Sequence, residues 1–202
     1  MNKNDLRFIK TEKLIKDAFI DLLDESGVKG VSVRALCEKA LISRNTFYMH
    51  YETISNLVES IYVDVWRDFG KNYELTKAEN TSVEQGIRWY IDQVDSHRHT
   101  IRALFRYDMR NFDKIVYDYV FRQPMMLVYD DFDSYTTDVR VQLNIGFILS
   151  AVITYTVTWL DNYDRISKEL RVKDMAELLR MPLKLFRDKL HQVMERDKNK
   201  RD

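Results

Sequence analysis

Two very short helices in direct succession are the feature that most limits how this chain can fold. Ser32 and Ser43 are good N-cap residues, and each precedes only seven or eight residues of helical pattern, over Val33–Ala40 and Arg44–His50. Helices of about two turns bury little surface by themselves. The sequence therefore predicts that both pack on a longer neighbour.

The segment before them supplies that neighbour. From Leu6 to Leu23 apolar residues recur at helical spacing, and Ser26-Gly27 is a stop signal. Only Leu41-Ile42-Ser43 joins the two short helices, which is the spacing of a helix-turn-helix. We expect a three-helix unit at the N-terminus.

The rest of the chain is also predicted to be helical. The 202 residues include only 5 Gly and 2 Pro, too few turn residues for a β-sandwich or β-barrel. The expected fold is all-α: an N-terminal three-helix unit, a long helix, and a larger helical bundle. The further helices are predicted at Ile54–Tyr73, Ser82–Ser96, Thr100–Tyr107, Phe112–Phe132, Thr137–Asn162 and Val172–Asp197, the last interrupted or bent near Pro182.

Charge and cysteine content limit the cellular context. Cys37 is the only cysteine, and the N-terminus has no apolar run of signal-peptide type, so we expect a cytoplasmic protein. The net charge is zero, so any nucleic-acid contact must be local. The apolar run Leu143–Leu160 has the length of a membrane span, but its spread of Ser and Thr favours a protein interior or a subunit interface, and no membrane partner is expected.

The second short helix carries side chains suited to reading DNA. A short capped helix after a tight turn can present its outward residues to a major groove. Arginine can donate two hydrogen bonds to guanine, and asparagine pairs similarly with adenine. Phe47 and Tyr51 should face the core. The expected exposed set is Arg44, Asn45, Tyr48, Met49 and His50.

The residues Val31–Leu57, VSVRALCEKALISRNTFYMHYETISNL, resemble the DNA-binding signature of the TetR family of bacterial transcription regulators. The most specific part is Ser43–Tyr51, with its small cap, Thr46, apolar Phe47, Tyr48 and aromatic Tyr51. The resemblance implies a DNA-binding domain at residues 1–53 and a dimerisation and effector domain at 54–202. It also implies a homodimer that binds double-stranded DNA at a palindromic operator, as a repressor released by a small ligand.

By motif position, the resemblance also implies roles for individual residues. Those placed at bases are Arg34, Arg44, Asn45 and Met49, and those placed at phosphates are Ser32, Thr46, Tyr48 and His50. With the cap residue Ser43 added, the candidate DNA-binding set is Ser32, Arg34, Ser43, Arg44, Asn45, Thr46, Tyr48, Met49 and His50.

Two residues depart from the family pattern. Leu41 stands in the turn where the family commonly has glycine, and a left-handed conformation there would cost about 1 to 2 kcal/mol. Ile54 stands where the family usually has a phosphate-binding lysine, and it cannot donate to an anion. An alternative is therefore a co-regulator of the same fold that acts through a protein partner with weak or no DNA binding of its own.

The C-terminal part offers an interface and a candidate pocket. The helices predicted at Thr137–Asn162 and Val172–Asp197 carry enough apolar residues to form a four-helix dimer bundle, or simply to line the monomer core. A set of aromatic and methionine residues is consistent with an effector pocket or with ordinary core: Trp89, Tyr90, Phe105, Tyr107, Phe112, Tyr117, Tyr119, Phe121, Met125, Met126, Tyr129 and Phe132.

We expect no catalytic residues, no metal site and no cofactor. His97 and His99 lie near Asp92 and Asp95, but a spacing of two on a helix points the histidines apart. The chain has no Gly-rich phosphate loop, no Ser or Cys nucleophile motif and no HExxH. A small helical-bundle enzyme is the remaining, disfavoured class.

Overall fold

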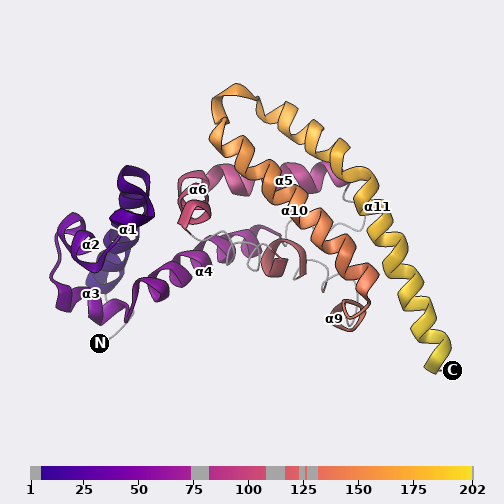
Figure 1. Ribbon diagram of the computed structural model, residues 1–202, viewed down its shortest axis with the longest axis horizontal. Helices are drawn as coiled ribbons and strands as arrows, with labels where there is room; N and C mark the ends of the chain where they lie inside the picture. The colour runs from indigo at the N-terminus through magenta and orange to yellow at the C-terminus, as the bar shows by residue number, and fades with distance from the viewer. Residues whose placement is uncertain (1–5, 74–81, 108–116, 123–125, 127–131, 202) are drawn as a thin grey trace. The chain divides into compact units, whose positions relative to one another are not determined.

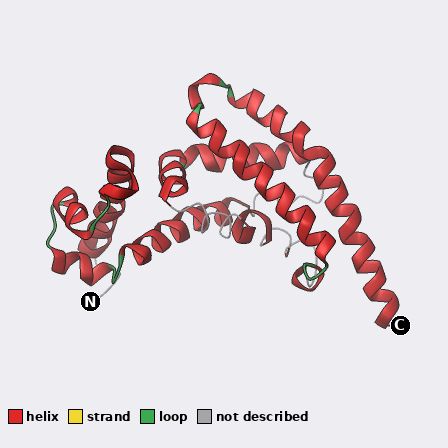
Figure 2. Ribbon diagram, viewed as in Figure 1, coloured by secondary structure: helices red, strands yellow, loops and turns green. Residues whose placement is uncertain are grey.

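The protein is all-α. The computed structural model describes residues 6–73, 82–107, 117–122, 126 and 132–201, and within these ranges the ordered elements are helices joined by short turns (Figure 2). The chain divides into two compact units: unit 1 is Met1–Asp68 with His97–Phe112, and unit 2 is Phe69–Ser96 with Asp113–Asp202. The expected division at residues 53 and 54 is a division by function, and it stays a prediction.

Unit 1 is built on α1 (Leu6–Gly30), the indigo helix in Figure 1. Against it pack α2 (Val33–Ala40) and α6 (Arg98–Tyr107), and α3 (Arg44–His50) packs on α2. The first part of α4 (Ile54–Tyr73) completes the unit. The fully buried side chains Phe19, Leu36, Phe47, Leu57 and Ile101 come from five different helices, so each short helix is stabilised by the core that the others form.

Helix α1 is broken near its end, as the Ser26-Gly27 signal predicts. Gly27 has φ 63° and ψ −173°, a non-helical conformation that glycine adopts without steric cost. Elsewhere in unit 1, the rings of Phe19 in α1 and Tyr107 at the end of α6 meet edge to face, with 5.4 Å between their centroids. This contact fixes the end of α6 against the middle of α1.

Unit 2 is built around α10 (Val139–Asp161) and α11 (Lys168–Arg201), which pack along one another. Helix α11 also packs on α5 (Val83–Ser96) and touches α9 (Phe132–Tyr135). The unit further contains the π-helical turn η2 (Tyr117–Arg122) and the 3-10 turn η3 (Tyr163–Arg165).

A buried arginine joins three helices in unit 2. The Arg171 side chain is 4% exposed, and its Nη1 donates to Asp95 Oδ1 at 3.0 Å. Its guanidinium carbon lies 4.4 Å from the Trp159 ring centroid and 4.8 Å from that of Tyr163. The ion pair therefore holds α11 to the end of α5, while the two rings shield the charge from water.

Several helix boundaries follow from the caps. The bounds predicted for α2, α3 and α4 are confirmed, and so is the capping box of α5: the Gln85 amide donates to Ser82 Oγ at 3.2 Å, and the Ser82 amide donates to Gln85 Oε1 at 2.8 Å. Helix α11 differs, because it begins four residues earlier and is not interrupted at Pro182. Pro182 has no amide hydrogen, so the helix lacks one backbone hydrogen bond, to the carbonyl of Leu178, but continues through the proline. Most of the helix predicted at Phe112–Phe132 lies outside the described residues.

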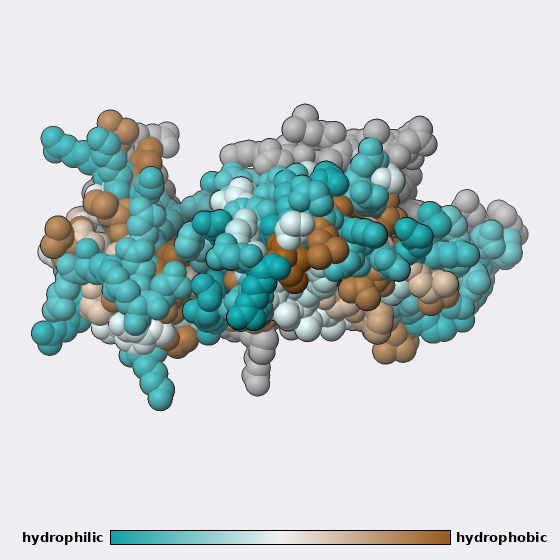
Figure 3. Space-filling view, turned by 90° about the horizontal axis from the view of Figure 1, so that it is seen from above, coloured by the Kyte–Doolittle hydropathy of each residue, from teal (hydrophilic) through white to brown (hydrophobic). Residues whose placement is uncertain are grey.

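Helix α10 has one buried and one exposed apolar face. Val141, Ile145 and Ile148 are buried inside unit 2, whereas Val139, Leu143 and Phe147 are 64% to 67% exposed. Within the described ranges, this helix alone has the length and apolar composition of a membrane span, which is weak evidence because core helices share those properties. Figure 3 shows apolar brown surface among teal in the region of α10 and α11.

Candidate nucleic-acid interface

Serine caps start both short helices of the candidate surface. Ser32 Oγ accepts from the Ala35 amide at 3.1 Å, and Ser43 Oγ accepts from the Thr46 amide at 3.0 Å. The Ser43 and Thr46 hydroxyls lie 2.8 Å apart, so they also share a hydrogen bond. These contacts fix the first turn of each helix, where candidate DNA-binding residues lie.

The turn between the helices is left-handed, as expected if Leu41 takes the place of a glycine. Leu41 has φ 54° and ψ 44°, and its side chain is 92% exposed. The Ile42 amide donates to the Cys37 carbonyl at 3.0 Å, which closes the end of α2 as in a Schellman motif. Backbone strain at Leu41 is therefore the cost of this turn.

Helix α3 presents one face to solvent and one to the core. Phe47 is fully buried and Tyr51 is 7% exposed, which confirms the core side. Tyr48 is 55% exposed and Met49 50% exposed. Of the remaining candidates, Ser32, Arg34, Ser43, Arg44 and Asn45 are exposed, and Thr46 is half-buried. The structure therefore brings the α3 candidates together on one surface, and their contact with DNA stays a prediction.

His50 corrects the expectation of a fully outward side chain. Its ring stacks on Phe8 of α1, with 3.9 Å between centroids and 23° between planes, and its Nδ1 is buried without a hydrogen-bond partner among the described residues. Burial lowers the pKa of His50, an effect partly opposed by Glu12, so the ring is neutral at pH 7. A phosphate contact would have to use Nε2. Nothing in the local sequence signals the stacking, because Phe8 is 42 residues away.

The cations around the surface differ in their pairing. Arg34 Nε donates to Glu38 Oε1 at 2.8 Å, and both side chains are exposed. Lys39 Nζ lies 2.6 Å from Glu25 Oε1, so it holds α2 to α1. Arg44 pairs with no carboxylate in the part of the chain that the structure describes, which leaves its guanidinium free to meet an external acceptor. The Arg34–Glu38 pair was not predicted, although its spacing of four on a helix could have indicated it.

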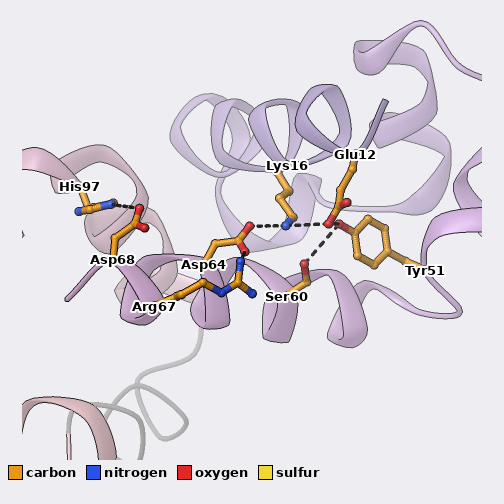
Figure 4. Close-up of polar contacts among 8 residues, drawn as sticks. All are labelled: Glu12, Lys16, Tyr51, Ser60, Asp64, Arg67, Asp68 and His97. Atoms are coloured by element: carbon orange, nitrogen blue, oxygen red, sulfur yellow. Dashed lines mark hydrogen bonds and ion pairs between the residues drawn. The ribbon is translucent and has the colours of Figure 1, made fainter. Parts of the chain in front are cut away.

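A polar network supports α3 from behind (Figure 4). Tyr51 Oη donates to Glu12 Oε1 at 3.1 Å and lies 3.4 Å from Ser60 Oγ. Lys16 Nζ is 2.9 Å from Glu12 Oε1 and also pairs with Asp64, so α1, α4 and the end of α3 are tied together. Burial raises the pKa of Tyr51, so its hydroxyl remains a donor over the physiological range.

Burial tends to raise the pKa of Glu12, but the hydrogen bond and charge of Lys16, with the Tyr51 hydroxyl, outweigh it and hold that pKa below its ordinary value. The carboxylate is therefore ionised at neutral pH and accepts from both partners.

The start of α4 lacks the expected lysine donor but is otherwise well formed. The Asn56 amide donates to Thr53 Oγ1 at 3.1 Å, so Thr53 caps the helix, and Ile54 is half-buried.

An open groove of about 880 Å³ runs between α1 and α4, lined by charged residues that include Glu12, Lys16 and Asp64. Its lining differs from the aromatic effector pocket expected in the C-terminal part.

The other candidate sites take ordinary structural roles where they are described. His97 Nε2 lies 3.4 Å from Asp68 Oδ2, while Asp92 pairs with Lys168 and Asp95 with Arg171. Among the described residues, no group of three or more His, Cys, Asp or Glu side chains is placed to hold a metal ion.

The aromatic candidates are only partly described. The buried Tyr90 hydroxyl bonds to Thr156 at 2.8 Å, and Phe121 and Phe132 are core residues. Phe112, Met125 and Tyr129 lie outside the described residues, and the effector pocket stays a prediction.

Comparison with known proteins supports the fold. No model of a known protein family matches the sequence. A segment of 60 residues is 28% identical to YxbF, an uncharacterized HTH-type transcriptional regulator from Bacillus subtilis strain 168. That match covers 30% of this chain but only 16% of YxbF.

Solved structures match most of the chain. A TetR transcriptional regulator from Streptococcus agalactiae superposes with a TM-score of 0.62 at 20% identity, over 87% of this chain and 96% of that one. The fatty acid degradation regulator FadR from Bacillus halodurans gives 0.62 at 14% identity, over 84% and 94%. A TetR-like transcriptional regulator from Rhodococcus sp. RHA1 gives 0.58 at 17%, over 86% and 95%. The all-α architecture described above is therefore the fold of TetR-family transcription regulators.

Proposed function

We propose that this protein is a homodimeric transcription regulator of the cytoplasm that binds a palindromic operator through α2 and α3, with no enzymatic activity. One observation carries the proposal: the exposed side of α3 gathers Arg44, Asn45, Tyr48 and Met49 over the fully buried Phe47. Arginine and asparagine are the side chains that read guanine and adenine in the major groove. The rigid core beneath them provides the fixed geometry that such reading needs.

An exposed apolar surface supports the dimer. On α10, Val139, Leu143 and Phe147 recur every four residues and are each more than 60% exposed. On α11, Leu178 and Met181 are 64% and 61% exposed. A monomer rarely leaves such a set uncovered, and α10 and α11 already pack together, so a second copy can cover both to form a four-helix bundle.

A dimer also satisfies the geometry of operator recognition. Two recognition helices must reach half-sites about 34 Å apart, or a multiple of that distance. An effector that binds one conformation better than another would change this separation and release or retain the operator. Repression with release by a small ligand is the form of regulation that we propose.

The test is DNA binding with a matched charge control. A protected promoter is first identified by nuclease footprinting, and affinity for that duplex is then measured by fluorescence anisotropy. Arg44→Ala combined with Tyr48→Ala should weaken binding at least about tenfold, because a base contact and a phosphate contact are lost in each half-site. Because Tyr48 is uncharged, only the loss of the Arg44 cation from each protomer should reduce the salt dependence, by at most about 2 in the log–log slope. The control Arg187→Ala removes the same charge from an exposed residue of α11 in unit 2 and should leave binding unchanged.

Two results would contradict the proposal. Binding that persists in the double variant would show that α3 does not contact DNA. Absence of any footprint, together with copurification of a protein partner, would favour the co-regulator, an alternative consistent with Ile54 at the start of α4 and with the engagement of Lys39 by Glu25.

A further inference from the structure

The exposed face of α2 carries an ion pair with a defined geometry. Arg34 Nε donates to Glu38 Oε1 at 2.8 Å, one helical turn further along. The two side chains are 75% and 65% exposed, so the pair is a surface feature and adds little to the stability of the fold. The hydrogen bond and charge of Glu38 raise the pKa of Arg34, which remains fully charged.

The carboxylate occupies only one edge of the guanidinium. An arginine side chain has five N–H groups, one on Nε and four on the two Nη nitrogens. Glu38 takes the Nε group, and no other described residue bonds the Nη nitrogens. Guanine offers two acceptors, O6 and N7, in the major groove, and two Nη donors can satisfy both. The arginine is therefore held at one side and free at the side that a base requires.

The neighbouring cations lack this arrangement. Lys39 is engaged with Glu25 and serves to hold α2 on α1. Arg44 has no carboxylate partner among the described residues and keeps its rotamer freedom until it meets a ligand. Arg34 is therefore the candidate base-contacting cation whose guanidinium is oriented before DNA arrives.

We propose that Glu38 is a positioning residue that orients Arg34 to read a guanine in each half-site. This inference rests on the proposed function. Glu38 places a negative charge near the DNA backbone, so it weakens attraction to every duplex. The oriented arginine, however, loses less side-chain conformational entropy when it binds guanine. It therefore discriminates better between guanine and the other bases.

The test measures discrimination instead of affinity alone. Each base pair of the footprinted operator is substituted symmetrically, and the guanine read by Arg34 is the position at which Arg34→Ala loses about fivefold or more in discrimination. At that position Glu38→Ala should lower the affinity ratio of the correct to the substituted duplex about two- to threefold. The same variant should raise affinity for both duplexes, because a negative charge is removed.

A second variant separates charge from orientation. Glu38→Gln removes the same charge but keeps an oxygen that can accept from Nε, so it should raise overall affinity equally and retain more of the ratio than Glu38→Ala. In the Arg34→Ala background, Glu38→Ala should leave the ratio unchanged. Circular dichroism verifies that all variants are folded.

The possible failures are distinguishable. If the wild-type protein binds no duplex specifically, the proposed function and this inference are overturned together. If the wild type binds specifically but Glu38→Ala leaves the affinity ratio of the correct to the substituted duplex unchanged, this inference alone is overturned. The inference also fails if Arg34→Ala alters discrimination at no position, or if the two Glu38 variants lose the ratio equally.

Discussion

Replacing Leu41 by glycine should stabilise the protein. Leu41 lies between α2 and α3 with φ 54° and ψ 44°, the left-handed region in which its Cβ approaches its own backbone. Its side chain is 92% exposed, so almost no buried contact is lost with it. The amide of Ile42 still donates to the Cys37 carbonyl at 3.0 Å, because the substitution leaves the backbone hydrogen bonds intact.

The expected gain is the difference between two opposing effects. Relief of the left-handed strain is worth about 1 to 2 kcal/mol. Glycine also gives the unfolded chain more freedom, which costs about 0.4 to 1 kcal/mol. The net gain in the free energy of unfolding is about 1 kcal/mol, or a rise in melting temperature of about 2 to 4 °C for a chain of this size.

Urea unfolding followed by circular dichroism measures this gain, with every variant at the same concentration because dimerisation shifts apparent stability. Leu41→Ala is the matched control, since it removes the leucine but keeps a Cβ at a positive φ. The glycine variant should unfold at higher urea than the wild type, and the alanine variant should not. If alanine stabilises as much as glycine, exposure of the leucine, and not backbone strain, limits stability, and the reasoning is refuted.

Three further changes test other parts of the structure. The folded pKa of Glu12 lies below its ordinary value of 4.5, so its contribution to stability is complete above that pH and is lost as pH falls through the folded pKa. The stability gap between wild type and Glu12→Gln should therefore narrow in urea titrations as pH falls below 4.5, and a gap independent of pH would contradict the network in Figure 4. Asp95→Asn should lower the free energy of unfolding by about 3 kcal/mol in thermal unfolding, because Arg171, 4% exposed, loses its counter-charge. Asp92→Asn, in the exposed pair with Lys168, should cost under about 1 kcal/mol. Equal costs would refute the claim that burial makes the Arg171 pair the more important one. Phe147 is 64% exposed in a single chain, and Phe147→Glu would bury a charge in the proposed dimer interface. The mass measured by sedimentation should therefore fall from that of a dimer, twice 24.3 kDa, to 24.3 kDa. A variant that remains dimeric would place the interface elsewhere.

The helix-turn-helix could be predicted in detail because its determinants are local. Ser32 and Ser43 each bond an amide three residues away, and such a contact depends only on the residues of one turn. The same holds for the Ser82 and Gln85 capping box of α5. The left-handed turn at Leu41 was suggested only by the resemblance, in which glycine commonly stands at this position.

The candidate surface was predicted less completely than the helices that carry it. The division of α3 into buried Phe47 and exposed Tyr48 follows from helical spacing. The half-burial of His50 does not, because it depends on how the start of α1 passes behind α3 and brings Phe8 onto the imidazole. Burial lowers the pKa of His50, and this effect could not be read from residues 43–51 alone.

In the part of the chain that the structure describes, the sequence by itself determined most of the helical segments, where the short helices begin, and which side of each is apolar. These properties depend on hydrogen bonds and spacing within a few residues. Only the tertiary structure decided which charges are paired across the chain, as in Lys16 with Asp64 and Arg171 with Asp95, 48 and 76 residues apart. Many acidic residues are equally near a given cation in the sequence, and packing of the helices selects one of them by excluding water and fixing distance.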